Sequence, residues 1–244
     1  MMEDKIIGRN PVLEAIKSGR PIDKILIKKG RPEGSLTAII KKAKDAGLVI
    51  QEADHRKLDA VAEGGNHQGI IAYVSPYEYS NVKDILASAH EKGEPPFVII
   101  CDRITDPHNL GAILRTANCA GAHGVIVPKR SSVGLNETVV KTAAGAAEYT
   151  PVAKVTNIAS TIEELKKEGL WIAAADMDGT ELYKADLTGA LGIVIGSEGE
   201  GIGRLVKERC DFTVSIPMTG NINSLNASVA AGVIMYEALR QRRK

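Results

Sequence analysis

Two stretches near the end of the chain decide its fold: Gly192–Gly203 reads GIVIGSEGEGIG, and Ser215–Gly232 reads SIPMTGNINSLNASVAAG. The first is an apolar run that ends in a glycine-rich turn containing Glu198. The second begins as a short strand, crosses a turn of glycine, asparagine and serine, and enters an alanine-rich helix. Two such strand-to-loop crossings at the carboxyl edge of a sheet form a pocket lined by backbone N–H groups. The glycine turn comes late in the chain, whereas a dinucleotide-binding fold places it after the first strand of its domain.

Outward from these stretches, apolar runs alternate with helical patterns. Phe97–Asp102 (FVIICD) is a continuous apolar run that fits a buried parallel strand. The pattern predicts an α/β fold with a mostly parallel sheet that has helices on both faces. Beyond this strand, helices are expected over residues 110–120, 157–168, 203–209 and 225–240, and strands over 124–127, 170–175, 192–195 and 212–216.

A second, smaller α/β unit is predicted at the N-terminus, where strand and helix patterns alternate over residues 10–74. Pro76–Pro96 is polar and ends in a proline pair, a composition typical of a linker. The predicted organisation is therefore a first domain at residues 1–75, a linker at 76–96 and a second domain at 97–244.

The composition is that of an ordinary soluble globular protein, with 44% hydrophobic and 25% charged residues in 244. No apolar run approaches the roughly 18 residues of a membrane span, and the charges at Glu3, Asp4 and Lys5 argue against a signal peptide. The three cysteines form no C-x-x-C pair, so we expect reduced thiols, no metal site and a cytoplasmic protein.

Basic side chains concentrate in the first quarter of the chain. Residues 1–60 hold thirteen Lys and Arg against nine Asp and Glu, whereas residues 61–244 hold eighteen against twenty-one. The basic residues cluster at Lys24–Arg31 and Lys41–Lys44. This distribution indicates a module that binds a polyanion, although a solvated lysine face on a helix explains the charge equally well.

The loop and helix at Asp102–Arg115 hold the first candidate site residues. Asn109 stands near the start of a predicted helix, where it either caps the helix or contacts a ligand. Gly111 would let a neighbouring backbone come close. Arg115 lies further along the helix among apolar positions and needs a partner, for which a phosphate or a carboxylate suits its guanidinium.

The two stretches quoted first hold the other candidates. The GSEGEG turn has no following Gly-Lys-Ser/Thr and has Arg204 where a dinucleotide fingerprint needs its third glycine. Glu198 suits a cationic ligand better than a pyrophosphate; a plain tight turn is the alternative. Ser224, Leu225 and Asn226 stand at the mouth of the last helix, where Ser224 is a candidate cap, a ligand contact or both.

Three segments together resemble the signature motifs of the SpoU branch of the SPOUT RNA methyltransferases, in order, spacing and residue type. They are NLGAILRTA at Asn109–Ala117, IVIGSEGEG at Ile193–Gly201, and the stretch from Ile216 to Ala230 with IPM, SLNASVA and an intervening glycine. The N-terminal unit resembles the ribosomal-protein-like substrate-binding domain of bacterial guanosine 2′-O-methyltransferases that act on 23S ribosomal RNA. The likeness covers nearly the whole chain.

The resemblance implies a deep trefoil knot formed by the C-terminal segment, a homodimer in which the last helix and the first motif meet across the interface, and S-adenosylmethionine as methyl donor. It implies RNA as partner, bound through the basic N-terminal domain and the dimer surface. The implied catalytic residues are Arg115, Asn109, Glu198, Ser224 and Asn226. The implied cofactor-binding residues are Gly196, Glu198, Gly199, Ile216, Met218, Ser224 and Leu225.

Methyl transfer to a ribose hydroxyl requires alignment of the reactants and removal of a proton. Because an arginine stays protonated in proteins, Arg115 is expected to anchor the RNA phosphate beside the target ribose, and that phosphate or Glu198 takes the proton. Glu198 could instead hold Arg115 in place. The alternatives are a transfer-RNA enzyme of the same family, or a non-catalytic RNA-binding protein that would leave the three loops unexplained.

Overall fold

The computed structural model of this chain describes residues 5–243, which divide into two compact units. The first contains the residues up to Glu78 together with Leu135–Glu137. The second contains Tyr79–Gly134 and the chain from Thr138 onward. Glu3 and Asp4, on which the expectation about a signal peptide partly rests, lie outside the described residues.

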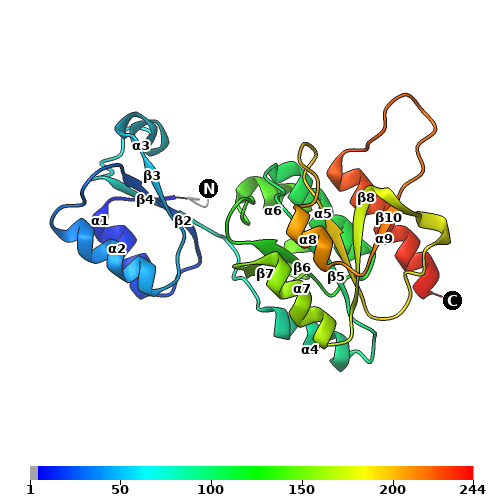
Figure 1. Cartoon of the computed structure of the whole chain (residues 1–244). Coiled ribbons are helices and arrows are strands. Elements are labelled where there is room, and N and C mark those ends of the chain that lie inside the picture. The colour runs from blue at the N-terminus through cyan, green and yellow to red at the C-terminus, as the bar shows by residue number, and fades with distance from the viewer. Residues whose placement is uncertain (1–4, 244) are drawn as a thin grey trace. The chain divides into compact units, whose positions relative to one another are not determined.

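The first unit is a four-stranded mixed sheet in the order β1-β4-β2-β3 with three helices (Figure 1). β2 pairs in parallel with β3, and β4 pairs antiparallel with both β1 and β2. Its elements are β1 (Lys5–Ile7), α1 (Arg9–Lys17), β2 (Ile22–Lys28), α2 (Ser35–Asp45), β3 (Ile50–Ala53), α3 (His55–Ala62) and β4 (Ile70–Val74).

Alternation along the central strands gives this unit two apolar faces. On β2, Ile25 and Ile27 pack with helices α1 and α2, whereas Leu26 packs on the opposite side with Leu58 of α3. Successive side chains of a strand point to opposite faces, so both faces of the sheet carry a helical layer. The unit is a three-layer α/β sandwich.

The second unit is a six-stranded, wholly parallel sheet in the order β10-β8-β9-β5-β6-β7. β5 and β9 lie at its centre and are buried along their whole length, as expected for strands covered on both faces. The elements are α4 (Val82–Glu91), β5 (Phe97–Cys101), α5 (Pro107–Cys119), β6 (Gly124–Pro128), α6 (Glu137–Ala143), η1 (Ala146–Glu148), β7 (Val152–Val155), α7 (Ile158–Lys167), β8 (Trp171–Glu181), η2 (Leu182–Lys184), β9 (Leu191–Ile195), α8 (Arg204–Arg209), β10 (Phe212–Ser215) and α9 (Ala227–Arg242).

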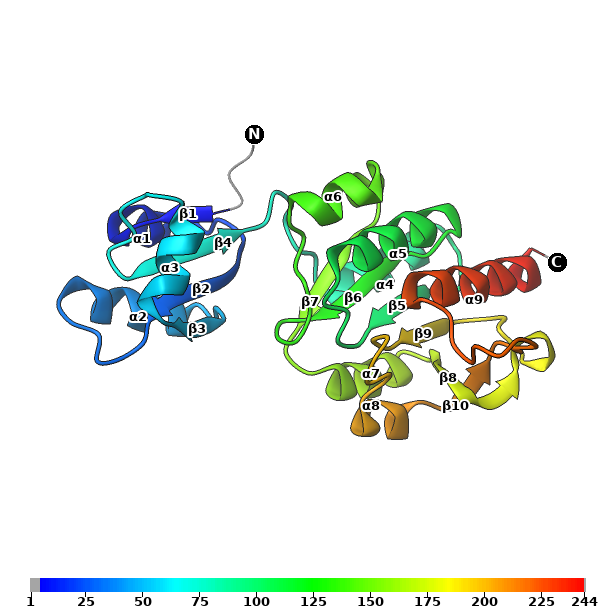
Figure 2. The same ribbon diagram turned by 90° about the horizontal axis from the view of Figure 1, so that it is seen from above.

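Helices cover both faces of the parallel sheet. α4, α7 and α8 share one apolar core with the sheet, while α5 and α9 pack against one another on the other side (Figure 2). The predicted α/β class with a mostly parallel sheet is therefore confirmed. Within residues 5–243, no helix combines the length and the apolar character that a membrane crossing requires.

The predicted linker at residues 76–96 is only partly irregular, because Val82–Glu91 forms helix α4. Asn81 and Asp84 form a reciprocal capping box at its start, and Ile85, Leu86 and Ala89 are buried on one side of it. The proline pair at the end of the segment and its polar composition concealed this helical spacing. Three shorter elements, β1, α6 and β7, were also not anticipated.

The three cysteines are free thiols, which agrees with the absence of a disulfide pattern in the sequence. Burial raises the pKa of the Cys101 thiol to about 12, and it has the same effect on Cys210. Both thiols are therefore protonated near neutral pH and poorly nucleophilic.

Gly111 on α5 allows α6 to approach closely, as the sequence predicts. A Cβ atom at this position would lie 2.5 Å from Cβ of Thr142 and 2.7 Å from the carbonyl oxygen of Val139. Since Val139 is fully buried, neither helix can move away without disturbing the core.

We expect Gly111→Ala to lower the free energy of unfolding by about 1–3 kcal/mol through overpacking, despite the higher helix propensity of alanine. Urea denaturation followed by circular dichroism measures the change. Gly220→Ala is the matched control, because a Cβ atom there meets nothing within 4 Å. Equal stability of Gly111→Ala and the control would show that α5 and α6 are not in contact at this point.

Candidate active site at the carboxyl edge of the parallel sheet

Three loops meet at the carboxyl edge of the parallel sheet, each following a different strand. They are the loop between β5 and α5, the glycine turn between β9 and α8, and the long loop between β10 and α9. Because all six strands are parallel, their carboxyl ends lie at one edge, where ligands bind in open α/β sheets.

A cavity of about 570 Å³ opens among the ends of β8, β9 and β10 and the start of α9. Apolar side chains form much of its wall, among them Val214, Ala230 and Ile234. Carboxylates lie at its rim, and Asp176 there forms an ion pair with Lys207 at 2.7 Å. All the residues implied to bind the cofactor line this one cavity: Gly196, Glu198, Gly199, Ile216, Met218, Ser224 and Leu225.

Gly196 has no room for a side chain. A Cβ atom there would lie 2.3 Å from the carbonyl carbon of Gly201 and 2.4 Å from the amide nitrogen of Ile202. The turn is closed by reciprocal backbone hydrogen bonds between Ser197 and Gly201, at 3.2 and 3.0 Å. The glycine turn is thus a compact wall of the cavity whose backbone is held in place.

Glu198 is held by two side-chain amides from other loops. Nδ2 of Asn109 donates to Oε1 of Glu198 at 3.0 Å, and Nδ2 of Asn226 donates to the same oxygen. The two asparagines also contact each other, since Nδ2 of Asn226 donates to Oδ1 of Asn109 at 2.9 Å. These three predicted residues therefore form one network that joins all three loops.

Asn109 is not the cap of α5, and Ser224 is not the cap of α9. Asp106 caps α5 by accepting from the backbone N–H groups of His108 and Asn109, at 2.6 and 3.1 Å. Asn226 caps α9 through Oδ1, which accepts from the N–H groups of Ser228 and Val229. The Asn109 side chain is consequently available to bond Glu198. Asp-Pro at a helix start was a sequence signal for the first cap.

A second cavity of about 680 Å³ lies on the other side of the glycine turn. It is lined by Asn109, by Ser197–Glu200 and by residues of the loop after β5. Residues 197–200 line both cavities, so the glycine turn stands between them, and Glu198 is the residue of the turn that both asparagines hold. A site of this form can hold two reactants, one on each side of a proton acceptor.

The sequence reasoning did not identify Asp102 and Arg103 at the end of β5. The Asp102 carboxylate is buried and accepts the N–H of Gly203 at 2.7 Å, which fixes the end of the glycine turn. Arg103 adopts a left-handed backbone with φ of 59° and forms an ion pair with Glu200. The sequence signal for these two residues was their position, because Asp102 and Arg103 are charged and come directly after the buried strand β5.

Arg115 does not reach either cavity of its own chain. It lies on the exposed side of α5, and within residues 5–243 it forms no ion pair or side-chain hydrogen bond. Six residues at about 100° each place it about 120° around the helix from Asn109, so the two side chains cannot point to one place. Glu198 is held by the two amides, and the predicted contact between Glu198 and Arg115 does not occur within this chain.

Comparison with protein families gives two matches that together span most of the chain. Residues 96–236 match the family described as "SpoU rRNA Methylase family". Residues 5–80 match the domain described as "RNA 2'-O ribose methyltransferase substrate binding".

Individual proteins and solved structures resemble the chain in the same way. A TrmH family tRNA/rRNA methyltransferase, YacO of Bacillus subtilis, is 48% identical over 240 residues, which are 98% of this chain and 96% of that protein. The SpoU methyltransferase AviRb from Streptomyces viridochromogenes, solved in complex with AdoMet, is 25% identical with a TM-score of 0.60, covering 97% of this chain and 89% of AviRb. The TrmH/SpoU tRNA modifying enzyme of A. aeolicus is 28% identical with a TM-score of 0.55, covering 66% of this chain and 84% of that enzyme.

The two roles of Asn226 can be separated by substitution. Asn226→Ala removes the cap of α9 and should lower the free energy of unfolding by about 1 kcal/mol or more. Asn226→Ser keeps a capping oxygen and loses the amide, so its stability should lie within about 0.5 kcal/mol of the natural chain. Urea denaturation measures both variants. If they were equally destabilised, the amide bonds to Asn109 and Glu198 would be the main structural contribution instead of the cap.

Proposed function

This chain belongs to the SpoU rRNA methylase family, and from that premise we propose that it methylates a ribose 2′-hydroxyl of RNA, at a guanosine of 23S ribosomal RNA. The methyl donor is S-adenosylmethionine, the cofactor that the family uses. The observation that carries the proposal is the position of Glu198 at the boundary of two cavities, with its orientation set by two amides.

The first cavity fits S-adenosylmethionine by the chemistry of its walls. Small and apolar residues such as Ala227, Ala230 and Leu225 suit a flat adenine ring, and the closed glycine turn offers backbone groups beside them. The carboxylates at the rim suit a positively charged ligand. When bound, S-adenosylmethionine supplies a methyl group already activated by a sulfonium centre. We also infer that the C-terminal segment forms the trefoil knot of the family around this cavity.

In this proposal Glu198 acts as the general base. Its Oε1 accepts from Asn109 and Asn226, which leaves Oε2 to accept the proton that the ribose hydroxyl loses as its oxygen gains the methyl group. Both asparagines act as positioning residues, because amides orient the carboxylate without taking part in proton transfer. Ser224 lines the cofactor cavity in an exposed loop and would support the bound ligand there.

Arg115 would complete the site of a partner subunit in a homodimer. Val229 and Tyr236 of α9 are 51% and 52% exposed, and they mark an apolar face that nothing covers within residues 5–243. A Cβ atom on Gly232 of α9 would lie 3.7 Å from Cγ2 of Thr116, the neighbour of Arg115, so this face adjoins the exposed side of α5. A permanently charged guanidinium at the interface suits the RNA phosphate next to the target ribose.

The two-unit organisation supports ribosomal RNA as the proposed substrate. AviRb covers 97% of this chain, whereas the A. aeolicus tRNA modifying enzyme covers 66%. A substrate that engages both units therefore fits better than one served by the catalytic unit alone. Transfer RNA is the alternative substrate, since YacO bears the name of a tRNA/rRNA methyltransferase.

The test uses ribosomal and transfer RNA purified from cells that lack this protein. The natural chain should transfer labelled methyl from S-adenosylmethionine to a guanosine ribose in large-subunit ribosomal RNA. Glu198→Gln should reduce this transfer by about 10²- to 10⁴-fold, because the general base is removed, while calorimetry still detects cofactor binding. Glu208→Gln, on the exposed side of α8, is the matched control. Label confined to transfer RNA would identify the alternative substrate, and label on a base would contradict ribose methylation.

Mixing two inactive variants tests whether Arg115 acts on its partner's site. A dimer that combines an Arg115→Ala chain with a Glu198→Gln chain contains one site with both natural residues if Arg115 reaches across the interface. After exchange of subunits, activity should return to about a quarter of the natural level, since half the dimers are mixed and one of their two sites is intact. No recovery in verified mixed dimers would show that Arg115 does not act across the interface.

A further inference from the structure

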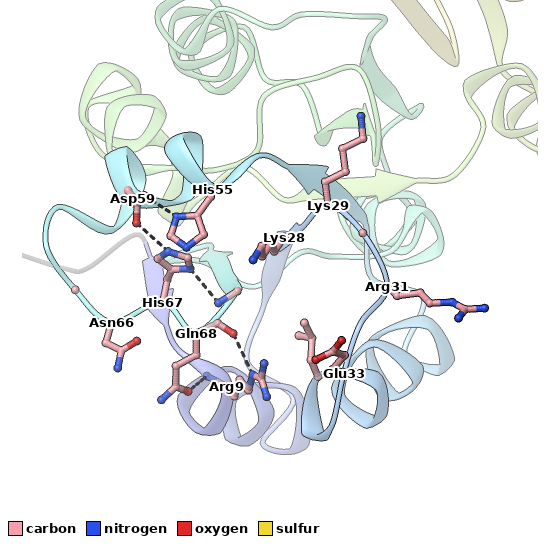
Figure 3. Close-up of a pocket in the computed structure, with 14 residues that line it drawn as sticks. Arg9, Lys28, Lys29, Arg31, Glu33, His55, Asp59, Asn66, His67 and Gln68 are labelled. Carbon is pink, nitrogen blue, oxygen red and sulfur yellow. Dashed lines mark hydrogen bonds and ion pairs between the residues drawn. The ribbon is translucent and has the colours of Figure 1, made fainter.

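The N-terminal unit contains a cavity of about 630 Å³ (Figure 3), and it shares no lining residue with the two cavities of the second unit. Its wall is formed by the end of β2 and the residues that follow, by the starts of α1 and α3, and by the loop before β4. Its charged and imidazole side chains are Arg9, Lys28, Lys29, Arg31, Glu33, His55, Asp59 and His67. This size is typical of cavities that hold small ligands or single groups of larger ones.

The cations of this cavity outnumber its carboxylates and form no ion pairs within the described residues. Four of its residues are Lys or Arg and two are carboxylates, and within the described part of the chain none of the four cations forms an ion pair. The structure thereby separates the two basic clusters of the sequence. Lys28, Lys29 and Arg31 line the cavity, whereas Lys41, Lys42 and Lys44 lie along α2 outside it.

The loop before β4 is held in a strained shape at the edge of this cavity. Gln68 has a left-handed backbone with φ of 49°, which is uncommon for a residue with a side chain. Arg9 fixes it twice: its backbone N–H donates to Oε1 of Gln68 at 3.1 Å, and its Nε donates to the carbonyl oxygen of Gln68 at 3.0 Å. Strain that is maintained by specific contacts is typical of binding sites.

Asp59 is occupied by two histidines and does not offset the cations. Nδ1 of His55 lies 2.7 Å from Oδ2 of Asp59, and Nε2 of His67 lies 3.1 Å from Oδ1. The hydrogen bond from His55, with a second from His67, lowers the pKa of the Asp59 carboxyl. His55 is exposed, and its ring is fixed by Asp59 and by an edge contact with the His67 ring, with centroids 5.0 Å apart.

These three residues resemble a metal-binding cluster, but the hydrogen bonds argue against one. The backbone N–H of Gly69 donates to Nδ1 of His67 at 2.9 Å. Nδ1 is therefore an acceptor and Nε2 carries the hydrogen in the neutral ring, so Nε2 has no lone pair to offer a metal ion. The cluster instead serves to orient the exposed ring of His55.

We propose that this cavity binds one unpaired nucleotide of the RNA substrate, with phosphates at Lys28 and Lys29 and the base stacked on the ring of His55. The proposal rests on the proposed function for its ligand class. Lysines without protein partners bind phosphates as point charges, and exposed rings in fixed orientation stack unpaired bases. Polar groups of Asn66 and Gln68 lie nearby for hydrogen bonds to a base edge.

Affinity measured over a range of salt concentrations tests the binding of phosphates by the two lysines. The probe is protein-free large-subunit ribosomal RNA from cells that lack this protein, bound to the full chain. Lys28→Ala/Lys29→Ala should weaken binding about tenfold and reduce the slope of log affinity against log salt by about 0.7 for each phosphate that is no longer neutralised. Lys41→Ala/Lys42→Ala removes the same charge from α2 and should stay within about threefold of the natural chain. Equal behaviour of the two double variants would overturn the proposal.

Variants of His55 test the stacking contact separately. His55→Ala should weaken binding about tenfold with an unchanged salt slope, because stacking releases no counterions. His55→Phe keeps a ring and should bind within about threefold of the natural chain. If His55→Ala and His55→Phe bound the RNA with the same affinity, the ring would have no stacking role, and the proposed base contact at His55 would be wrong.

Cofactor calorimetry and methyl transfer are measured on the same variants to distinguish the two hypotheses. Weaker RNA binding by the lysine and His55→Ala variants, with cofactor binding unchanged, supports the nucleotide site even if no methyl transfer is detected. Natural affinity in every variant, alongside methyl transfer by the natural chain, would remove the nucleotide site and leave the proposed function intact.

Discussion

One carboxylate oxygen, Oε1 of Glu198, fixes the geometry on which the catalytic unit depends. A parallel sheet brings the ends of β5, β9 and β10 to one edge, but it does not set the distances between the loops that follow. The amides of Asn109 and Asn226 set them by converging on that oxygen. Because Asn226 also caps α9, the start of that helix, the glycine turn and α5 are positioned together. The three loops are therefore coupled through one network of hydrogen bonds.

The sequence predicted the two α/β units and the parallel sheet, and it placed three loops at one edge because loops that follow parallel strands must share it. The individual residues of the first cavity came from the resemblance to the SpoU motifs. The Asp106-Pro107 signal for the cap of α5 was overlooked, and only packing assigns the free Asn109 amide to Glu198. Helical periodicity turns Arg115 away from Asn109, so its expected role at the RNA phosphate stays a prediction that depends on a second subunit. Helix α4 was missed because a polar composition and two prolines outweighed three buried positions at helical spacing.

Strained backbone occurs beside the cavities of both units. Within residues 5–243, the non-glycine residues with positive φ are Glu63, Gln68, Arg103, Ser131 and Ala144. Gln68 lines the cavity of the N-terminal unit, and Arg103 and Ser131 line the second cavity beside Glu198. Arg9 holds Gln68, and the ion pair with Glu200 holds Arg103. Such conformations persist only where neighbours over-determine them, so these contacts set the shape of the cavities before a ligand arrives.

The charged residues that line the cavities differ between the two units. Three carboxylates line the first catalytic cavity, but Asp176 is paired with Lys207 and Glu200 with Arg103, so within residues 5–243 Glu198 is the one without an ion pair and suits a cationic methyl donor. Cations without ion pairs at Lys28, Lys29 and Arg31 supply the attraction for a polyanion in the other unit. Under the two proposals, the site for the cationic donor and the site that attracts the polyanion therefore lie on different units of the chain.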